Sequence, residues 1–176
     1  MWSDELADLS TTPIPFAWET VILARQCSIK RVLKPALYEL VRTEGLGQDY
    51  VLDDEGINDR KLLFKAREKL VSVWITAAAS LPNKFLACCS KSLDARACTA
   101  GDPDSVNQVH AKLIPVFDQY KWDPVCGFKA LMKVPWKEEG FCKECVGRRW
   151  RAWEKERKRC WENLDVWFEL DEGNEK

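Results

Sequence analysis

The chain has 176 residues, a formal net charge of −1, 46% hydrophobic residues and 31% charged residues. A chain of this length buries a substantial core, and this composition excludes disorder over the whole sequence. No apolar stretch approaches the roughly 20 residues of a membrane-spanning helix, and the acidic N-terminus lacks the pattern of a signal peptide, so we expect an intracellular protein of the cytoplasm or nucleus.

Residues 1–15 are expected to form a flexible lead-in, because Pro13 and Pro15 interrupt any regular helix. Apolar residues at helical spacing then predict one helix over residues 16–29 and a second over residues 32–41. A third helix is predicted over residues 59–78. We expect the first two helices to pack on the third.

The predicted ends of the third helix depend on two local signals. Asn58 or Asp59 is a suitable N-cap, since its side chain can accept a hydrogen bond from the first turn. The helix is expected to end near Pro82, because proline lacks the backbone N–H that a helix interior requires. Residues 82–105 are polar and are predicted to be irregular.

The C-terminal half is also predicted to be helical. Asp104 or Ser105 is expected to cap a helix that extends to Phe117, and a short helix follows over residues 125–134. One long helix is predicted over residues 145–170. No segment alternates as a strand does, so the predicted fold class is mainly α: an irregular helical bundle with a long C-terminal helix and a cysteine-bearing loop, forming a single domain over residues 16–176.

Eight cysteines are unusual for a chain without a secretion signal, in which thiols are expected to stay reduced. Cys142 and Cys145 have CxxC spacing, which lets one turn present two thiolates to the same ion. Cys98, with Cys88 or Cys89, would supply a second pair. We predict a structural zinc site that joins residues 86–104 to residues 140–147, with these ligands: Cys89, Cys98, Cys142 and Cys145.

Two other interpretations of the thiols stay open. They could be small buried side chains, or Cys142 and Cys145 could form a redox pair, although the strand expected before a thioredoxin-like motif is not predicted. His110, the single histidine, could replace one cysteine as a ligand. The remaining helical cysteines are expected to be buried: Cys27, Cys126 and Cys160.

The chain is not predicted to be an enzyme, because it lacks a phosphate-binding glycine loop, an HExxH motif and a nucleophile elbow. The last predicted helix has tryptophans and a basic face (Arg148, Arg151, Lys155, Lys158 and Arg159). A zinc-dependent nucleic-acid-binding protein that uses this face is therefore an alternative. The interspersed Glu144, Glu154 and Glu156 instead favour a solvated helix face, so protein partners are expected and nucleic acid is not.

Several segments in this order resemble one family: residues 23–29, 32–40, 67–70, the cysteines near 89 and 98, residues 123–124, 141–145 and 161–170. Together they resemble the helical region that follows the BTB/POZ domain in many fungal proteins of the basidiomycete type. The resemblance covers residues 17–170 and implies a non-enzymatic adaptor that binds other proteins. The BTB fold itself would precede residue 1, so the chain is expected to be a C-terminal half or a truncated product, and the resemblance implies no oligomeric state for it.

Overall fold

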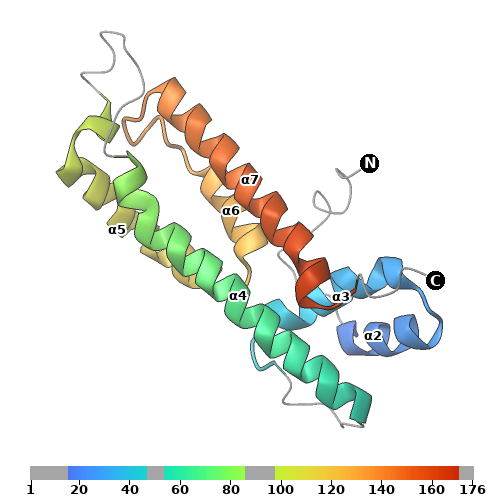
Figure 1. Cartoon of the computed structure of the whole chain (residues 1–176). Helices are drawn as coiled ribbons and strands as arrows, with labels where there is room; N and C mark the ends of the chain where they lie inside the picture. Colours follow the sequence, from blue (N-terminus) through green and yellow to red (C-terminus); the bar gives the residue numbers. More distant parts are fainter. Residues whose placement is uncertain (1–15, 47–53, 86–97, 171–176) are drawn as a thin grey trace. The chain divides into compact units, whose positions relative to one another are not determined.

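The computed structural model describes residues 16–46, 54–85 and 98–170. In this part of the chain it contains six α-helices and no strand, which confirms the mainly α fold class (Figure 1). The elements are α2 (Ala17–Gln26), α3 (Lys30–Arg42), α4 (Asp54–Phe85), the 3₁₀ turn η2 (Thr99–Gly101), α5 (Pro103–Gln119), α6 (Pro124–Lys133) and α7 (Lys143–Trp167). The predicted lead-in, residues 1–15, lies outside the described residues. None of the described helices combines the length and the apolar character that crossing a membrane requires.

The chain divides into two compact units. Unit 1 consists of residues 1–71 and 159–176, and unit 2 consists of residues 72–158. The helices α4 and α7 therefore each contribute residues to both units. The assignment of residues 16–176 to a single domain stays a prediction.

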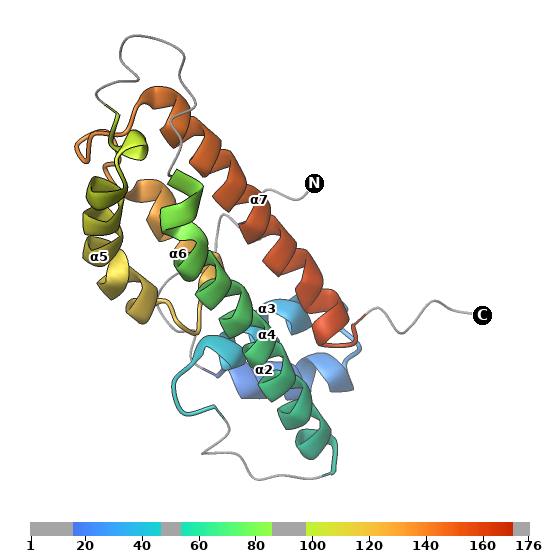
Figure 2. The same ribbon diagram turned by 60° about the vertical axis from the view of Figure 1, so that its left-hand side comes forward.

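In unit 1, α2 and α3 lie side by side (Figure 2). The Arg25 guanidinium pairs with the Asp59 carboxylate and so joins α2 to the first part of α4. The Lys34 ammonium of α3 lies 2.7 Å from a carboxylate oxygen of Asp165. The fully buried Tyr38 meets Trp161 edge-on with ring centroids 5.6 Å apart, so the end of α7 completes the core of this unit.

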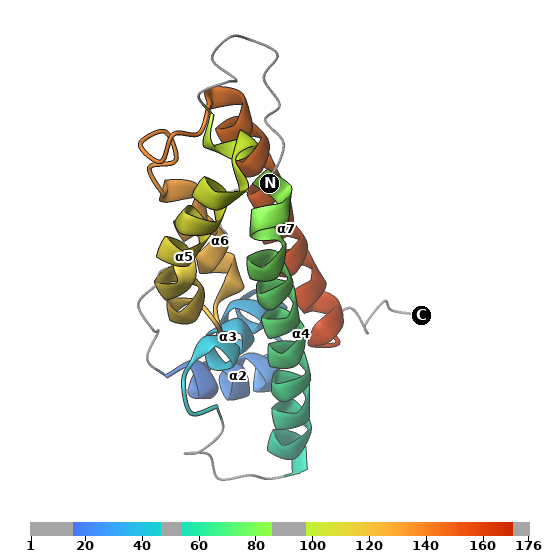
Figure 3. The same cartoon turned by 90° about the vertical axis from the view of Figure 1, so that its left-hand side faces the viewer.

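In unit 2, α5 and α6 are neighbours (Figure 3). The buried Trp74 contacts an aromatic ring of each of these two helices. Its ring lies 5.0 Å from that of Phe117 and 5.2 Å from that of Phe128, between centroids. Its indole N–H donates to the carbonyl oxygen of Phe117 at 2.8 Å. A Cβ at Gly127 would lie 2.6 Å from the Trp74 ring, so the indole packs directly on the backbone of α6.

The predicted limits of the third helix are wrong at both ends, because α4 begins at Asp54 and continues through Pro82 to Phe85. Pro82 has no N–H to donate to the carbonyl of Ala78, which would normally leave that oxygen without a partner. The Nε2 atom of His110 lies 3.1 Å from this oxygen and supplies the hydrogen bond. A side chain of α5 therefore allows the helix to pass a proline.

Two smaller predictions are also corrected. The N-cap of α5 is Asp102, whose carboxylate accepts from the backbone N–H groups of Asp104 and Ser105, so the helix begins earlier than predicted. Cys27 is exposed, whereas burial was expected. The reason is that α2 ends at Gln26, where the chain turns through Ser28 in a left-handed conformation (φ 56°).

Candidate metal centre

The turn η2 is attached to the segment that precedes α7 by two hydrogen bonds. The backbone N–H of Thr99 donates to the carbonyl oxygen of Gly140 at 3.0 Å. The Thr99 hydroxyl donates to the carbonyl oxygen of Glu139 at 2.7 Å. Gly140 has φ +81°, and a Cβ there would collide with the Thr99 hydroxyl. A glycine is therefore required at this position both for its conformation and for the close approach. Cys98 and Cys142 flank these contacts in the sequence.

Trp136 supports the same segment from the core of unit 2. Its indole N–H donates to the carbonyl oxygen of Leu131 at 2.8 Å, and its ring lies 5.2 Å from that of Trp153 in α7. Phe141 meets Trp136 edge-on at 5.5 Å and donates its backbone N–H to the carbonyl oxygen of Trp136. Because Phe141 precedes Cys142, this packing determines where the first cysteine of the CxxC motif lies.

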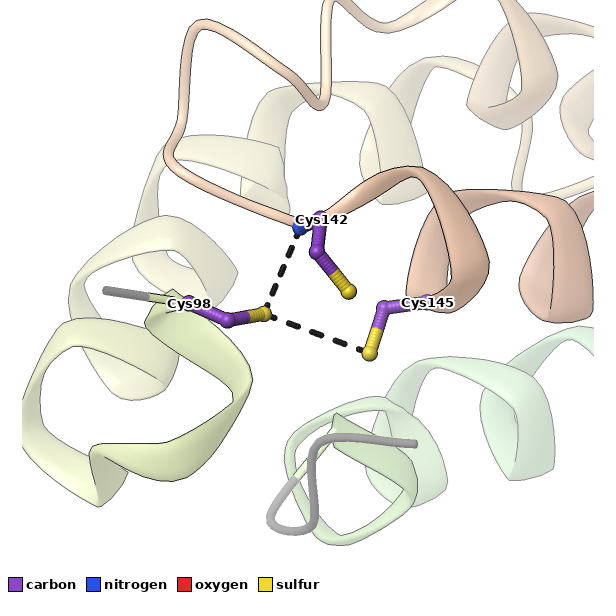
Figure 4. A group of neighbouring side chains, drawn as sticks. All are labelled: Cys98, Cys142 and Cys145. Atoms are coloured by element: carbon purple, nitrogen blue, oxygen red, sulfur yellow. Dashed lines mark hydrogen bonds between the residues drawn. The ribbon is translucent and has the colours of Figure 1, made fainter. Parts of the chain in front are cut away.

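Three cysteine sulfurs converge where η2 meets the beginning of α7 (Figure 4). The Sγ atoms of Cys98 and Cys145 lie 4.0 Å apart, and all three Sγ atoms, including that of Cys142, lie within 4.8 Å of one another. The backbone N–H of Cys142 also donates to the Cys98 sulfur at 3.3 Å. Cys98 and Cys145 are buried, and Cys142 is half-buried.

This arrangement has the chemistry of a metal site. Zn–S bonds of about 2.3 Å in a tetrahedron place sulfurs about 3.8 Å apart, close to the observed separation of Cys98 and Cys145. Cys142 and Cys145 lie at the N-terminal end of α7, where the helix dipole favours the thiolate form that binds metals. The N–H donated to Cys98 stabilises negative charge on that sulfur as well. The three thiols are thus close enough to bind one metal ion.

The predicted ligands have different outcomes. Cys98, Cys142 and Cys145 come together from positions up to 47 residues apart. Cys88 and Cys89 lie outside the described residues, so the fourth predicted ligand stays a prediction. His110 does not join the group of ligand atoms found in the described residues, because its ring is engaged with Ala78.

Thr99 and Gly140, which bring the thiols together, were not predicted from the sequence. Gly140 lies two residues before the CxxC motif, and a glycine there is a turn signal that could have been noticed. Nothing in the sequence pairs it with Thr99. An ion pair between Lys112 and Glu139, at 2.6 Å, further joins α5 to this segment.

Comparison of the chain with models of protein families, with curated proteins and with solved structures found no match. The likeness to the region after the BTB domain therefore stays a prediction. The function has to be inferred from the geometry of the chain itself.

Proposed function

We propose that the chain is a non-enzymatic, intracellular protein-interaction module that is stabilised by a structural zinc ion. The observation that carries the interaction role is the apolar surface of α2 and α3. Five of the ten large hydrophobic side chains that are exposed in the described residues belong to this short region: Phe16, Ile22, Leu23, Ile29 and Val32. Exposed apolar side chains gathered in this way are typical of surfaces that bind other proteins.

Apolar side chains of α2 lie on its exposed surface as well as on the face that is buried within unit 1. Ala17, Val21 and Ala24 are buried, whereas Phe16 and Leu23 are 72% and 59% exposed. Phe16 is the N-cap residue of α2 and has a left-handed backbone (φ 63°), so it lies at the beginning of the helix, whereas Leu23 lies within the helix and outside its buried face. A helix with apolar residues outside its buried face usually has a second surface to bury, which a partner protein would supply.

A pocket of about 260 Å³ opens beside this surface. Its walls are mainly apolar and include Ala17 and Thr20 of α2 and Val32, Pro35 and Ala36 of α3. A bulky apolar side chain of a partner fits such a pocket, in the way that anchor residues fill pockets at protein interfaces. We therefore propose that the partner inserts an aromatic or aliphatic side chain here.

The resemblance to the helical region after a fungal BTB/POZ domain supports the same proposal. Two of the segments that carry it, residues 23–29 and 32–40, lie in α2, in α3 and in the turn between them. The resemblance implies an adaptor role for residues 17–170 as a whole, and we propose that this surface carries it.

Binding to a purified partner tests the interaction role. A photo-crosslinking amino acid at position 23 would identify the partner, whose affinity is then measured for the wild type, for Leu23→Asp and for Ile114→Asp. Ile114 is the matched control, since it is 58% exposed on α5 in unit 2. We expect Leu23→Asp to weaken binding by about 30-fold or more, as loss of an interface anchor does, and Ile114→Asp to have no effect. Equal affinities for all three proteins would refute the proposed surface.

For the metal we propose zinc, with Cys89 as the fourth ligand. Structural zinc sites are closed by four protein ligands, and thiolates are the ligands that such sites use most. Three thiols already converge, and the segment that carries Cys89 runs directly into Cys98. A fourth thiolate would attach that segment, which is polar in sequence, to the beginning of α7.

Elemental analysis of the full chain, purified without added metal, tests the zinc proposal. We expect one zinc per chain, loss of that zinc in Cys89→Ser, and its retention in Cys88→Ser. Adjacent side chains point in different directions, so only one of the two cysteines is expected to bind. Protein without zinc that also fails to take up the metal from solution would contradict the proposal.

A further inference from the structure

The part of α7 that belongs to unit 2 exposes a strongly basic surface. Eight residues of 143–158 are exposed, and five of them carry a positive charge, which we call the cationic strip: Lys143, Arg148, Arg151, Lys155 and Lys158. Glu144 is the single acidic residue among the eight. The chain as a whole has a net charge of −1, so this surface is a local concentration of charge and not a general property.

The segment contains two further glutamates, and neither of them is exposed as the five cations are. Glu154 and Glu156 are half-buried, and Glu154 lies 3.6 Å from the buried Arg157, while its second oxygen lies 4.0 Å from Lys158. Lys158 therefore has an acidic neighbour within the segment. Arg151 and Lys155 project from the exposed face.

Trp150 adds an aromatic surface next to these charges. It is 47% exposed, more than any other tryptophan of the described residues, whereas Trp153 is buried one turn further along α7. Lys143 and Trp150 are seven residues apart and so lie on the same side of the helix. An exposed indole provides a face on which an unpaired base can stack.

We propose that the cationic strip and Trp150 bind single-stranded nucleic acid, with the five cations contacting phosphates and the indole stacking on a base. Residues 143–158 extend over about 22 Å of helix, which suits a short run of nucleotides. This binding role is additional to the proposed protein interaction, which uses α2 and α3.

The exposed indole is the reason to choose a single strand over other polyanions. A duplex offers phosphates but keeps its bases stacked on one another, and an acidic peptide has no base to stack. A membrane surface requires a helix whose apolar face is free to enter the lipid, but Cys145 and Trp153 on that face of α7 are buried in unit 2.

Fluorescence anisotropy of a labelled 20-nucleotide oligo(dT), titrated with the zinc-supplemented full chain at several salt concentrations, tests the proposal. Five phosphate contacts on a single strand give a slope of log K against log salt of about −3.5. Arg151→Gln/Lys155→Gln should flatten the slope by about 1.4. Trp150→Ala should weaken binding about tenfold and leave the slope unchanged, because stacking releases no counterions.

Matched controls come from α4, where Lys65, Lys69 and Phe64 are exposed. Lys65→Gln/Lys69→Gln removes the same charge, and Phe64→Ala removes an exposed aromatic ring. We expect both control proteins to bind as the wild type does. Circular dichroism of every variant shows that the helices persist.

Three results would overturn the proposal. One is the absence of salt-dependent binding to oligo(dT) by the wild type. Another is equal loss of affinity in the α4 controls, which would mean that binding is not located on α7. The third is binding to a 20-base-pair duplex or to polyglutamate that is as tight as binding to oligo(dT) and insensitive to Trp150→Ala, which would assign the surface to polyanions in general.

Discussion

The Nε2 atom of His110 donates a hydrogen bond to the carbonyl oxygen of Ala78, 3.1 Å away. That oxygen would accept from residue 82 in an uninterrupted helix, but residue 82 is proline. The single histidine of the chain therefore has a structural role in unit 2, where it supplies the donor that α4 lacks. Its ring also lies 6.0 Å from that of Phe117.

We expect His110→Phe to lower the free energy of unfolding by about 1–3 kcal/mol, the cost of leaving a partly buried carbonyl without a partner. In the background of Pro82→Ala, a backbone N–H becomes available to the Ala78 oxygen, so the same substitution should cost less than half as much. Urea denaturation of the four proteins gives this coupling as a double-mutant cycle. An identical cost in both backgrounds would show that His110 acts only through packing.

The proposed zinc site predicts that cysteines of similar burial differ in their effect on the metal content of the protein. Cys98→Ser, Cys142→Ser and Cys145→Ser should each remove most of the bound zinc, and hydrogen exchange should accelerate together in η2 and in the first turn of α7. Cys160→Ser is the control, since Cys160 is 1% exposed but is not among the converging thiols. It should keep its zinc and lose only packing. Zinc retained by Cys145→Ser would exclude that thiol as a ligand.

Adding a single methyl group at Gly140 is expected to lower the stability of the protein strongly. Gly140→Ala places a Cβ in a left-handed conformation, which costs about 1–2 kcal/mol, and adds a collision with the Thr99 hydroxyl. The variant should also bind zinc more weakly, because η2 positions Cys98. Gly101→Ala is the matched control, as a Cβ there meets nothing within 4 Å. Thermal unfolding with and without zinc measures both effects, and equal stability of the two variants would disprove the argument.

Asp102, the N-cap of α5, is expected to contribute to the free energy of unfolding in a pH-dependent way. Hydrogen bonds from the Ser105 hydroxyl, and then from the Ser105 backbone N–H, hold the pKa of the Asp102 carboxyl below its ordinary value. A carboxylate with a lowered pKa stabilises the fold at pH values above its unfolded pKa of about 3.9, and this contribution is lost as the pH falls through the folded pKa.

Asp102→Ala should therefore destabilise the protein by a constant amount between pH 5 and pH 8, and the difference from the wild type should shrink below about pH 4. Chemical denaturation across this range measures it. Asp118→Ala is the control, since the Asp118 side chain is 79% exposed and its nearest ion-pair distance is 4.0 Å. A difference that stays constant to pH 3.5 would mean that the charge of Asp102 is not what stabilises the helix.

Local patterns were sufficient to predict most of the helices. In α3 the apolar stripe at Leu33, Ala36, Leu37 and Leu40 is buried along its whole length, as its spacing predicted. The end of α4 could not be predicted in the same way. The group that allows the helix to pass Pro82 belongs to His110, 32 residues away from the carbonyl it serves. No local rule for proline includes such a partner.

In the candidate site, too, some ligands were predicted from local sequence patterns, and others depend on contacts between residues far apart in the sequence. The CxxC spacing of Cys142 and Cys145 is a local signal and was sufficient to choose them. Cys98 was predicted as a ligand because it lies in a polar segment, whereas the contacts that bring it to the site are those of Thr99 with Glu139 and Gly140, 40 and 41 residues away. The predicted burial of Cys27 was wrong because α2 ends one residue before it, so Cys27 does not lie on the buried face of that helix.

The order in which the two units occur along the chain has a consequence for synthesis. Every residue of unit 2 has left the ribosome once residue 158 has emerged. In unit 1, Lys34 can pair with Asp165 only after 131 further residues have been synthesised, and Tyr38 can pack on Trp161 only after that residue has been synthesised. Segments translated first thus complete their core last. Until then α3 lacks the contacts with Trp161 and Asp165 that complete the core of unit 1, so the first helices to be synthesised are among the last to be fully packed.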